Sequence, residues 1–163
     1  MSKCKKLLAL AIFIVVNSTA IAQQTLVPFV QWERANASWE SDTAEVAYVG
    51  ARCSALFQSI AAFFMSNPGK AEDTTTGLNL LVSSVMFNDV AENFASKRGM
   101  STEVITTRQK ALTEIYVTRM KENRSVHNNM FHEPVLGDVK FCRKSEALYQ
   151  ELSKRIDNKN KRP

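Results

Sequence analysis

The stretch YVGARCSALFQSIAAFF, residues 48–64, is the most apolar part of the chain beyond its N-terminal segment. Its large side chains recur every three or four residues, and such positions share one face of an α-helix. The pattern predicts an amphipathic helix that ends near Ser66. Asp42 as N-cap and Glu45 three residues later resemble a capping box at its start. The apolar stripe of this helix consists of Val46, Val49, Cys53, Leu56, Phe57, Ile60, Phe63 and Phe64.

Helical periodicity continues along the rest of the chain, whereas the alternation typical of β-strands is almost absent. A short helix is expected over residues 28–40, and a second long helix from residues 73–76 to a left-handed cap at Gly99. Ser101 and Asp138 are expected to cap a third and a fourth long helix. The sequence therefore predicts an all-α protein, with about four amphipathic helices in a compact bundle and a short N-terminal helix.

Each of the three later helices has its own apolar stripe, which we expect to face the core. Residues 121–137 are expected to be irregular, and the tail is expected to fray from about residue 157. The stripes are Leu78, Leu81, Val82, Val85, Met86, Val90 and Phe94 in the second long helix, Val104, Ile105, Leu112, Ile115, Tyr116 and Met120 in the third, and Cys142, Leu148, Leu152 and Ile156 in the fourth.

The N-terminal segment has the layout of a secretory signal peptide. Three lysines precede an apolar run at residues 7–16, and Ala20 and Ala22 provide a small-x-small cleavage site. The run is about ten residues long, whereas a transmembrane helix needs about 20. We therefore expect residues 1–22 to be cleaved, no transmembrane anchor after processing, and one helical domain over residues 23–163 in the periplasm or outside the cell.

Removal of that segment changes the charge of the protein. The whole chain has 21 basic and 16 acidic residues, and residues 1–22 contain three lysines and no acid. The mature chain then has 18 basic and 16 acidic residues, a formal charge of +2 instead of +5. Nucleic-acid binding requires a dense cationic face, so we expect no nucleic-acid partner.

Cleavage would also remove Cys4 and leave two cysteines, Cys53 and Cys142. Disulfides persist in exported proteins, so the sequence predicts that these two cysteines pair. The alternative is two separate buried thiols that pack as small apolar side chains. Neither cysteine belongs to a Cys-x-x-Cys pair, which disfavours a redox function.

Motifs for catalysis and for cofactors are missing from the sequence. It has no Gly-x-Ser-x-Gly elbow, no phosphate-binding glycine loop, no zinc-protease helix and no haem-attachment motif. The expectation is a protein without a cofactor and without a catalytic site. His127, Met130 and His132 form a weak candidate site for a soft metal, although the ordinary interpretation of this segment is a polar loop with two titratable side chains.

Phe29, Trp32 and Trp39 form an aromatic group near the mature N-terminus. These rings either close the core or present a surface to a partner. We expect a non-enzymatic binding or accessory protein whose partner is another protein. The alternatives are a small-ligand or metal carrier that uses the bundle interior or the 127–132 loop, and a small hydrolase.

Overall fold

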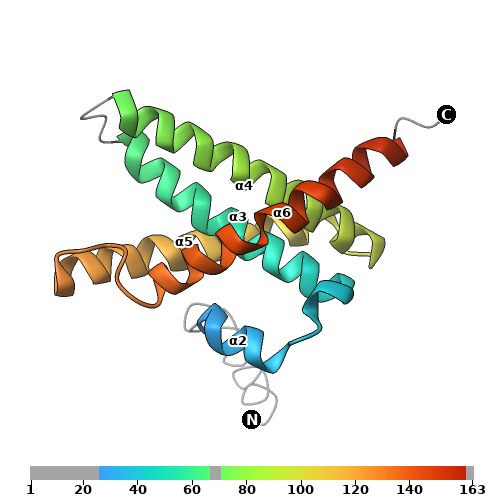
Figure 1. Cartoon of the computed structure of the whole chain (residues 1–163), viewed down its shortest axis with the longest axis horizontal. Coiled ribbons are helices and arrows are strands. Elements are labelled where there is room, and N and C mark those ends of the chain that lie inside the picture. The colour runs from blue at the N-terminus through green and yellow to red at the C-terminus, as the bar shows by residue number, and fades with distance from the viewer. Residues whose placement is uncertain (1–25, 67–70, 161–163) are drawn as a thin grey trace, which may run out of the picture.

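The computed structural model describes residues 26–66 and 71–160, and these form five α-helices and one short 3-10 helix without any β-strand (Figure 1). The all-α prediction is confirmed. Residues 1–22, where the signal peptide is predicted, lie outside the described residues. In chain order the elements are α2 (Phe29–Ala35), η2 (Trp39–Ser41), α3 (Thr43–Ser66), α4 (Ala71–Lys97), α5 (Thr102–His127) and α6 (Val135–Asn160).

The helix ends follow from local hydrogen bonds. The Ala44 amide donates to Oδ1 of Asp42 at 2.7 Å, which begins α3 as predicted. Gly99 adopts a φ of 79°. Its amide donates to the Ser96 carbonyl oxygen, and the Met100 amide donates to the Ala95 carbonyl oxygen. This bonding pattern is a Schellman motif, for which glycine is suited because it has no Cβ. Both of these predicted boundaries are confirmed.

Helix α3 is the central element of the fold. It runs antiparallel to α4 (Figure 1) and also packs against α5 and α6, while α2 packs on α6. Gly50 permits this close packing, because a Cβ there would lie 2.9 Å from the Phe87 carbonyl oxygen and 2.9 Å from a ring carbon of Tyr149. Among the described helices, only α3 is long and apolar enough to cross a membrane, but 72% of its apolar window is buried inside the protein. Such burial is typical of a core helix.

The predicted disulfide is present between Cys53 of α3 and Cys142 of α6. Both residues are fully buried, and their Cα atoms lie 5.5 Å apart across a sequence separation of 89 residues. The bond joins the central helix to the last helix.

The prediction for α4 is only partly confirmed. Val90 is buried as expected, and Leu81, Met86 and Phe94 pack against the core while partly exposed. Leu78, Val82 and Val85 are 53%, 71% and 57% exposed instead of facing the core. Helix α4 has apolar residues on more than one face, so hydrophobic periodicity alone does not orient it. The face that packs inward combines small residues, which allow close helix approach, with large ones: Gly77, Leu80, Ser84, Phe87, Val90, Ala91 and Ala95.

Other boundaries also differ from the predictions. The expected helix over 28–40 is divided into α2 and η2, and α4 begins at Ala71, before the predicted start. The irregular segment shortens to residues 128–134, because α5 continues to His127 and α6 begins at Val135. Asp138 thus lies in the first turn of α6 instead of capping it, and α6 continues past residue 157 to Asn160.

Candidate functional site

The aromatic group near the mature N-terminus packs into the core. Phe29 and Trp39 are buried, and the Phe29 ring stacks on Phe141 of α6 with the ring centroids 4.1 Å apart. Trp32 is partly buried and lies 6.0 Å from Trp39. Of the two alternatives, packing therefore accounts for Phe29 and Trp39, whose rings are not accessible to a partner in this conformation.

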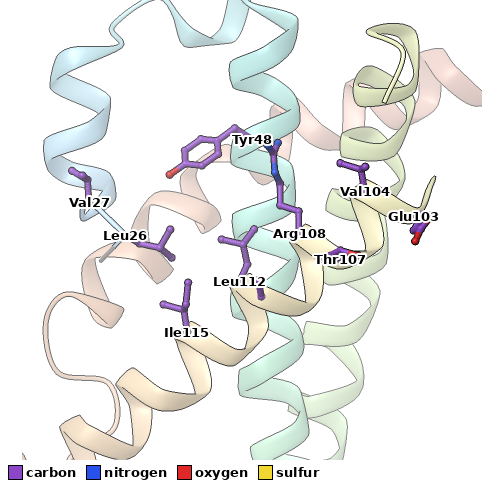
Figure 2. Close-up of a pocket in the computed structure, with 10 residues that line it drawn as sticks. Leu26, Val27, Tyr48, Glu103, Val104, Thr107, Arg108, Leu112 and Ile115 are labelled. Atoms are coloured by element: carbon purple, nitrogen blue, oxygen red, sulfur yellow. The ribbon is translucent and has the colours of Figure 1, made fainter. Parts of the chain in front are cut away.

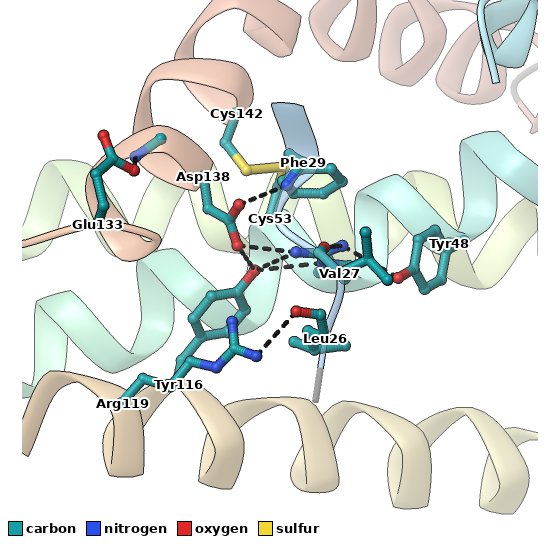
Figure 3. A network of polar contacts seen from close by, with 12 residues as sticks. Leu26, Val27, Phe29, Tyr48, Cys53, Tyr116, Arg119, Glu133, Asp138 and Cys142 are labelled. Atoms are coloured by element: carbon teal, nitrogen blue, oxygen red, sulfur yellow. Dashed lines mark hydrogen bonds and ion pairs between the residues drawn. A yellow bond between two sulfur atoms is a disulfide. The ribbon is translucent and has the colours of Figure 1, made fainter. Parts of the chain in front are cut away.

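A buried polar network joins four helices, and sequence reasoning missed it (Figure 3). Arg52 of α3 and Asp138 of α6 form an ion pair of 2.8 Å in which both side chains are fully buried. The Tyr116 hydroxyl of α5 donates to the same carboxylate oxygen at 2.7 Å. The Phe29 amide of α2 donates to the other oxygen at 2.8 Å. The one signal in the sequence is an arginine in the middle of an apolar helix.

The surroundings of Tyr116 and Arg52 favour the protonated form of both side chains. Burial raises the pKa of Tyr116, an effect that Arg52 opposes and Asp138 reinforces, so the phenol stays neutral and donates. Burial acts to lower the pKa of Arg52, but Tyr116, Asp138 and Tyr48 outweigh this effect and the pKa is raised. The charged and hydroxyl groups are therefore engaged with one another, and the network stabilises the fold instead of presenting a reactive group.

The structure brings the two histidines together. The rings of His127 and His132 stack with their centroids 3.7 Å apart and their planes 13° from parallel. A metal-bound imidazole directs a nitrogen in its ring plane at an ion about 2 Å away, and two stacked rings do not point at one ion. The carbonyl oxygen of Met130 accepts a hydrogen bond from the side-chain amide of Asn123. In the described part of the chain, no three His, Cys, Asp or Glu residues are grouped suitably for a metal.

An apolar cleft of about 840 Å³ lies beside α5 (Figure 2). One wall is the extended segment of Leu26 and Val27, which precedes α2, and the other is the first half of α5. Tyr48 of α3 lies between the two walls. The lining residues of α5 are Glu103, Val104, Thr107, Arg108, Ala111, Leu112 and Ile115.

A second hollow is a groove of about 710 Å³ between α4 and α5. Its floor is α3, where Ser54 and Ser59 are buried and Gln58 is exposed. Val85 lines the groove from α4 and Val117 from α5. Val85 also belongs to the exposed stripe of Leu78, Val82 and Val85, which we call the α4 stripe, so the stripe and the groove form one continuous surface.

The α4 stripe lies within a run of residues without charge. Residues 74–88, TTTGLNLLVSSVMFN, contain no Asp, Glu, Lys, Arg or His. A helix face that is exposed to water ordinarily carries charged residues. The absence of charged residues from every face of this part of α4 therefore indicated that an apolar face would be exposed. Hydrophobic periodicity instead assigned Leu78, Val82 and Val85 to the core.

No family model matches the chain, and comparison with curated proteins and with solved structures gives no significant match.

Proposed function

We propose that this protein is an exported, non-enzymatic binding protein that docks an apolar helix of a partner polypeptide on the α4 stripe and in the adjoining groove. The observation that carries the proposal is the exposure of Leu78, Val82 and Val85 on one uncharged helix face. These residues stand at i, i+4 and i+7, which places them on one side of α4.

The shape of the surface favours a helix as the docking element. An amphipathic helix lays an apolar face in a groove by means of anchors at i, i+3, i+4 and i+7. The groove offers such anchors a place between Val85 and Val117, with Ala62 on its floor. Gln58 and Thr113 line the same groove with amide and hydroxyl groups, and Glu92, Lys110 and Glu114 line it with charged groups. The docked helix would therefore place apolar anchors at Val85 and Val117 and polar residues beside these side chains.

Charge and size narrow the choice of partner. The α4 stripe is uncharged, so it is complementary to an apolar helix face and not to a charged one. A stable complex buries about 800 Å² on each partner. Three aliphatic side chains provide only part of that area, so a second copy packed on the α4 stripe alone would associate weakly. A helix that also enters the groove contacts a larger surface.

The stripe is large enough to matter energetically. Complete burial of a Val or Leu side chain is worth about 1.5–3 kcal/mol. Since the side chains of the α4 stripe are already partly covered, docking would add about 1 kcal/mol for each. A charge at Val82 would remove that gain and add the cost of desolvating the charge.

Site-specific photocrosslinking tests this proposal. A photoreactive residue at Asn79, which is exposed beside the stripe, should give an adduct in the extracytoplasmic fraction of the native host. The adduct should disappear in a Val82→Lys background and persist in a Val126→Lys background. Val126 is a matched control, because it is 73% exposed but lies on α5 outside the groove.

Two results would contradict the proposal. One is an adduct that forms equally from a photoreactive residue at Gln150, which is exposed on α6. The other is an adduct with twice the mass of the protein, which would identify a second copy as the occupant. Turnover of a substrate by the purified protein would instead favour the hydrolase alternative.

Export is part of the proposal and has its own measurement. The cleavage site after Ala22 and the pairing of Cys53 with Cys142 both support an oxidising compartment. Intact-mass measurement of the protein from its native host should give a chain that begins at Gln23. A chain that retains Met1 would count against export.

A further inference from the structure

We infer that the cleft between α5 and the segment of Leu26 and Val27 binds a single-chain amphiphile with an anionic head group, of the fatty-acid class. This inference does not depend on the proposed docking of a polypeptide, because the cleft and the α4 stripe share no residue.

The apolar part of the cleft suits an acyl chain. Leu26 lies opposite Leu112 and Ile115, and the lining of α5 extends from Val104 to Ile115 (Figure 2). Val104 and Ile115 are eleven residue steps apart, which on a helix spans about 16 Å, so the cleft is long enough for an extended acyl chain. Val27 and Val104 are 49% and 50% exposed, and a chain lying in the trough would cover both.

The wall of the cleft is held in place by two arginines. Arg52 donates to the Val27 carbonyl oxygen at 2.9 Å, and Arg119 donates to the Leu26 carbonyl oxygen at 2.9 Å (Figure 3). Arg52 is itself fixed by its buried ion pair with Asp138. Two consecutive carbonyl groups are thus bound from α3 and from α5, and the cleft is preformed, as ligand sites usually are.

The polar groups of the cleft suit an anion. The Tyr48 hydroxyl accepts a hydrogen bond from Arg52 at 3.1 Å, and no acceptor for its own proton is found among the described residues. The exposed guanidinium of Arg108 lines the same cleft and has no ion-pair partner in the described part of the chain. A carboxylate beside Arg108 can accept from its guanidinium, and hydrogen bonds to an ionised acceptor are the strong ones.

Among the described residues, Glu103 near the start of α5 is the only carboxylate that lines the cleft. In Figure 2 its side chain points away from Tyr48 and from the apolar wall. The head group is therefore placed beside Arg108, and the acyl chain beside Leu112 and Ile115. A neutral chain of the same length would fill the trough without the contact to Arg108.

Binding of dodecanoate and of dodecan-1-ol to the full mature chain, both below their micelle concentrations, tests the inference. Calorimetric titration should give saturable binding of one dodecanoate, with weaker binding of the alcohol. Arg108→Gln should weaken the binding of the acid by about tenfold, the loss of one charge-assisted hydrogen bond. The same variant should leave the binding of the alcohol unchanged, and Lys121→Gln on the exposed face of α5 should change neither.

A second pair of variants tests the location of the site. Ala111→Trp would fill the trough and should abolish the binding of both ligands, whereas Val126→Trp, on the same helix but outside the cleft, should bind both normally. The thermal transition of each variant establishes that it is folded. Absence of saturable binding, equal affinity for acid and alcohol, or undiminished binding by folded Ala111→Trp would overturn the inference.

Discussion

Substitution of Asp138 by Asn tests the buried network most directly. Asn has nearly the same shape as Asp, so the change removes a charge without creating a cavity. The carboxylate of Asp138 accepts from Arg52 at 2.8 Å, from Tyr116 at 2.7 Å and from the Phe29 amide at 2.8 Å. An amide has one oxygen and one donor nitrogen, so it cannot satisfy donors on both sides.

The expected loss of stability follows from the burial of the pair. Removing one member of a buried ion pair costs about 3–5 kcal/mol, because the remaining charge is left without compensation. Arg52 would be that charge, since its side chain is fully buried. A domain of this size is stable by about 5–15 kcal/mol, so Asp138→Asn should remove a large part of the total.

Urea unfolding followed by circular dichroism, with the disulfide intact, measures the loss. Asp157→Asn is the matched control, because Asp157 is exposed on the same helix. The control should stay within about 0.5 kcal/mol of the unsubstituted protein. A loss below about 1 kcal/mol for Asp138→Asn would refute the reasoning about the network.

A double substitution separates the pair from its surroundings. In the Arg52→Met, Asp138→Leu protein no buried charge of the pair remains. Its loss of stability should therefore be smaller than the sum of the two single losses, as expected for residues in direct contact. If the losses are simply additive, the two side chains do not act as a pair.

Three further changes should each give a measurable loss of stability. Replacement of Cys53 and Cys142 by Ser opens a loop of 89 residues, and should reduce the free energy of unfolding by about 4–5 kcal/mol in the chain-entropy treatment. Gly50→Ala places a Cβ 2.9 Å from the α4 backbone and should cost about 1–3 kcal/mol through overpacking. Burial raises the pKa of Tyr116 and Tyr149, so the unfolded chain ionises first and stability should fall as the pH rises above about 10.

Each of these predictions has a result that would contradict it. An unchanged unfolding midpoint after reduction would show that the disulfide does not stabilise the fold. A Gly50→Ala protein as stable as the original would mean that α3 and α4 can separate at no cost. In an alkaline absorbance titration, Tyr116 and Tyr149 should ionise only as the protein unfolds, so ionisation of all three tyrosines below the unfolding transition would be the contrary finding.

The sequence by itself determined the helical class, several boundaries and the disulfide. Asp42, Gly99 and Ser101 act through hydrogen bonds and backbone angles within a few residues, so their effects can be read locally. The disulfide could be predicted because the expected cleavage leaves only two cysteines. Neither the hydrogen bonds at the helix ends nor the number of cysteines depends on the way the helices pack.

The tertiary structure alone decided which faces are buried. Leu78, Val82 and Val85 satisfy the helical pattern, yet close packing of α4 on α3 favours the face that carries Gly77 and Ser84. Periodicity finds an apolar face, but it does not say which of two such faces meets a neighbour.

The same limit applies to the charged residues of the core. Arg52 and Asp138 are 86 positions apart, and nothing near either residue in the sequence indicates the other. Their pairing depends on how α3 and α6 cross, as does the cleft that Arg52 helps to hold open through Val27. Local sequence determines which elements form, whereas buried charges and clefts arise from contacts between distant elements, which only the folded chain brings together.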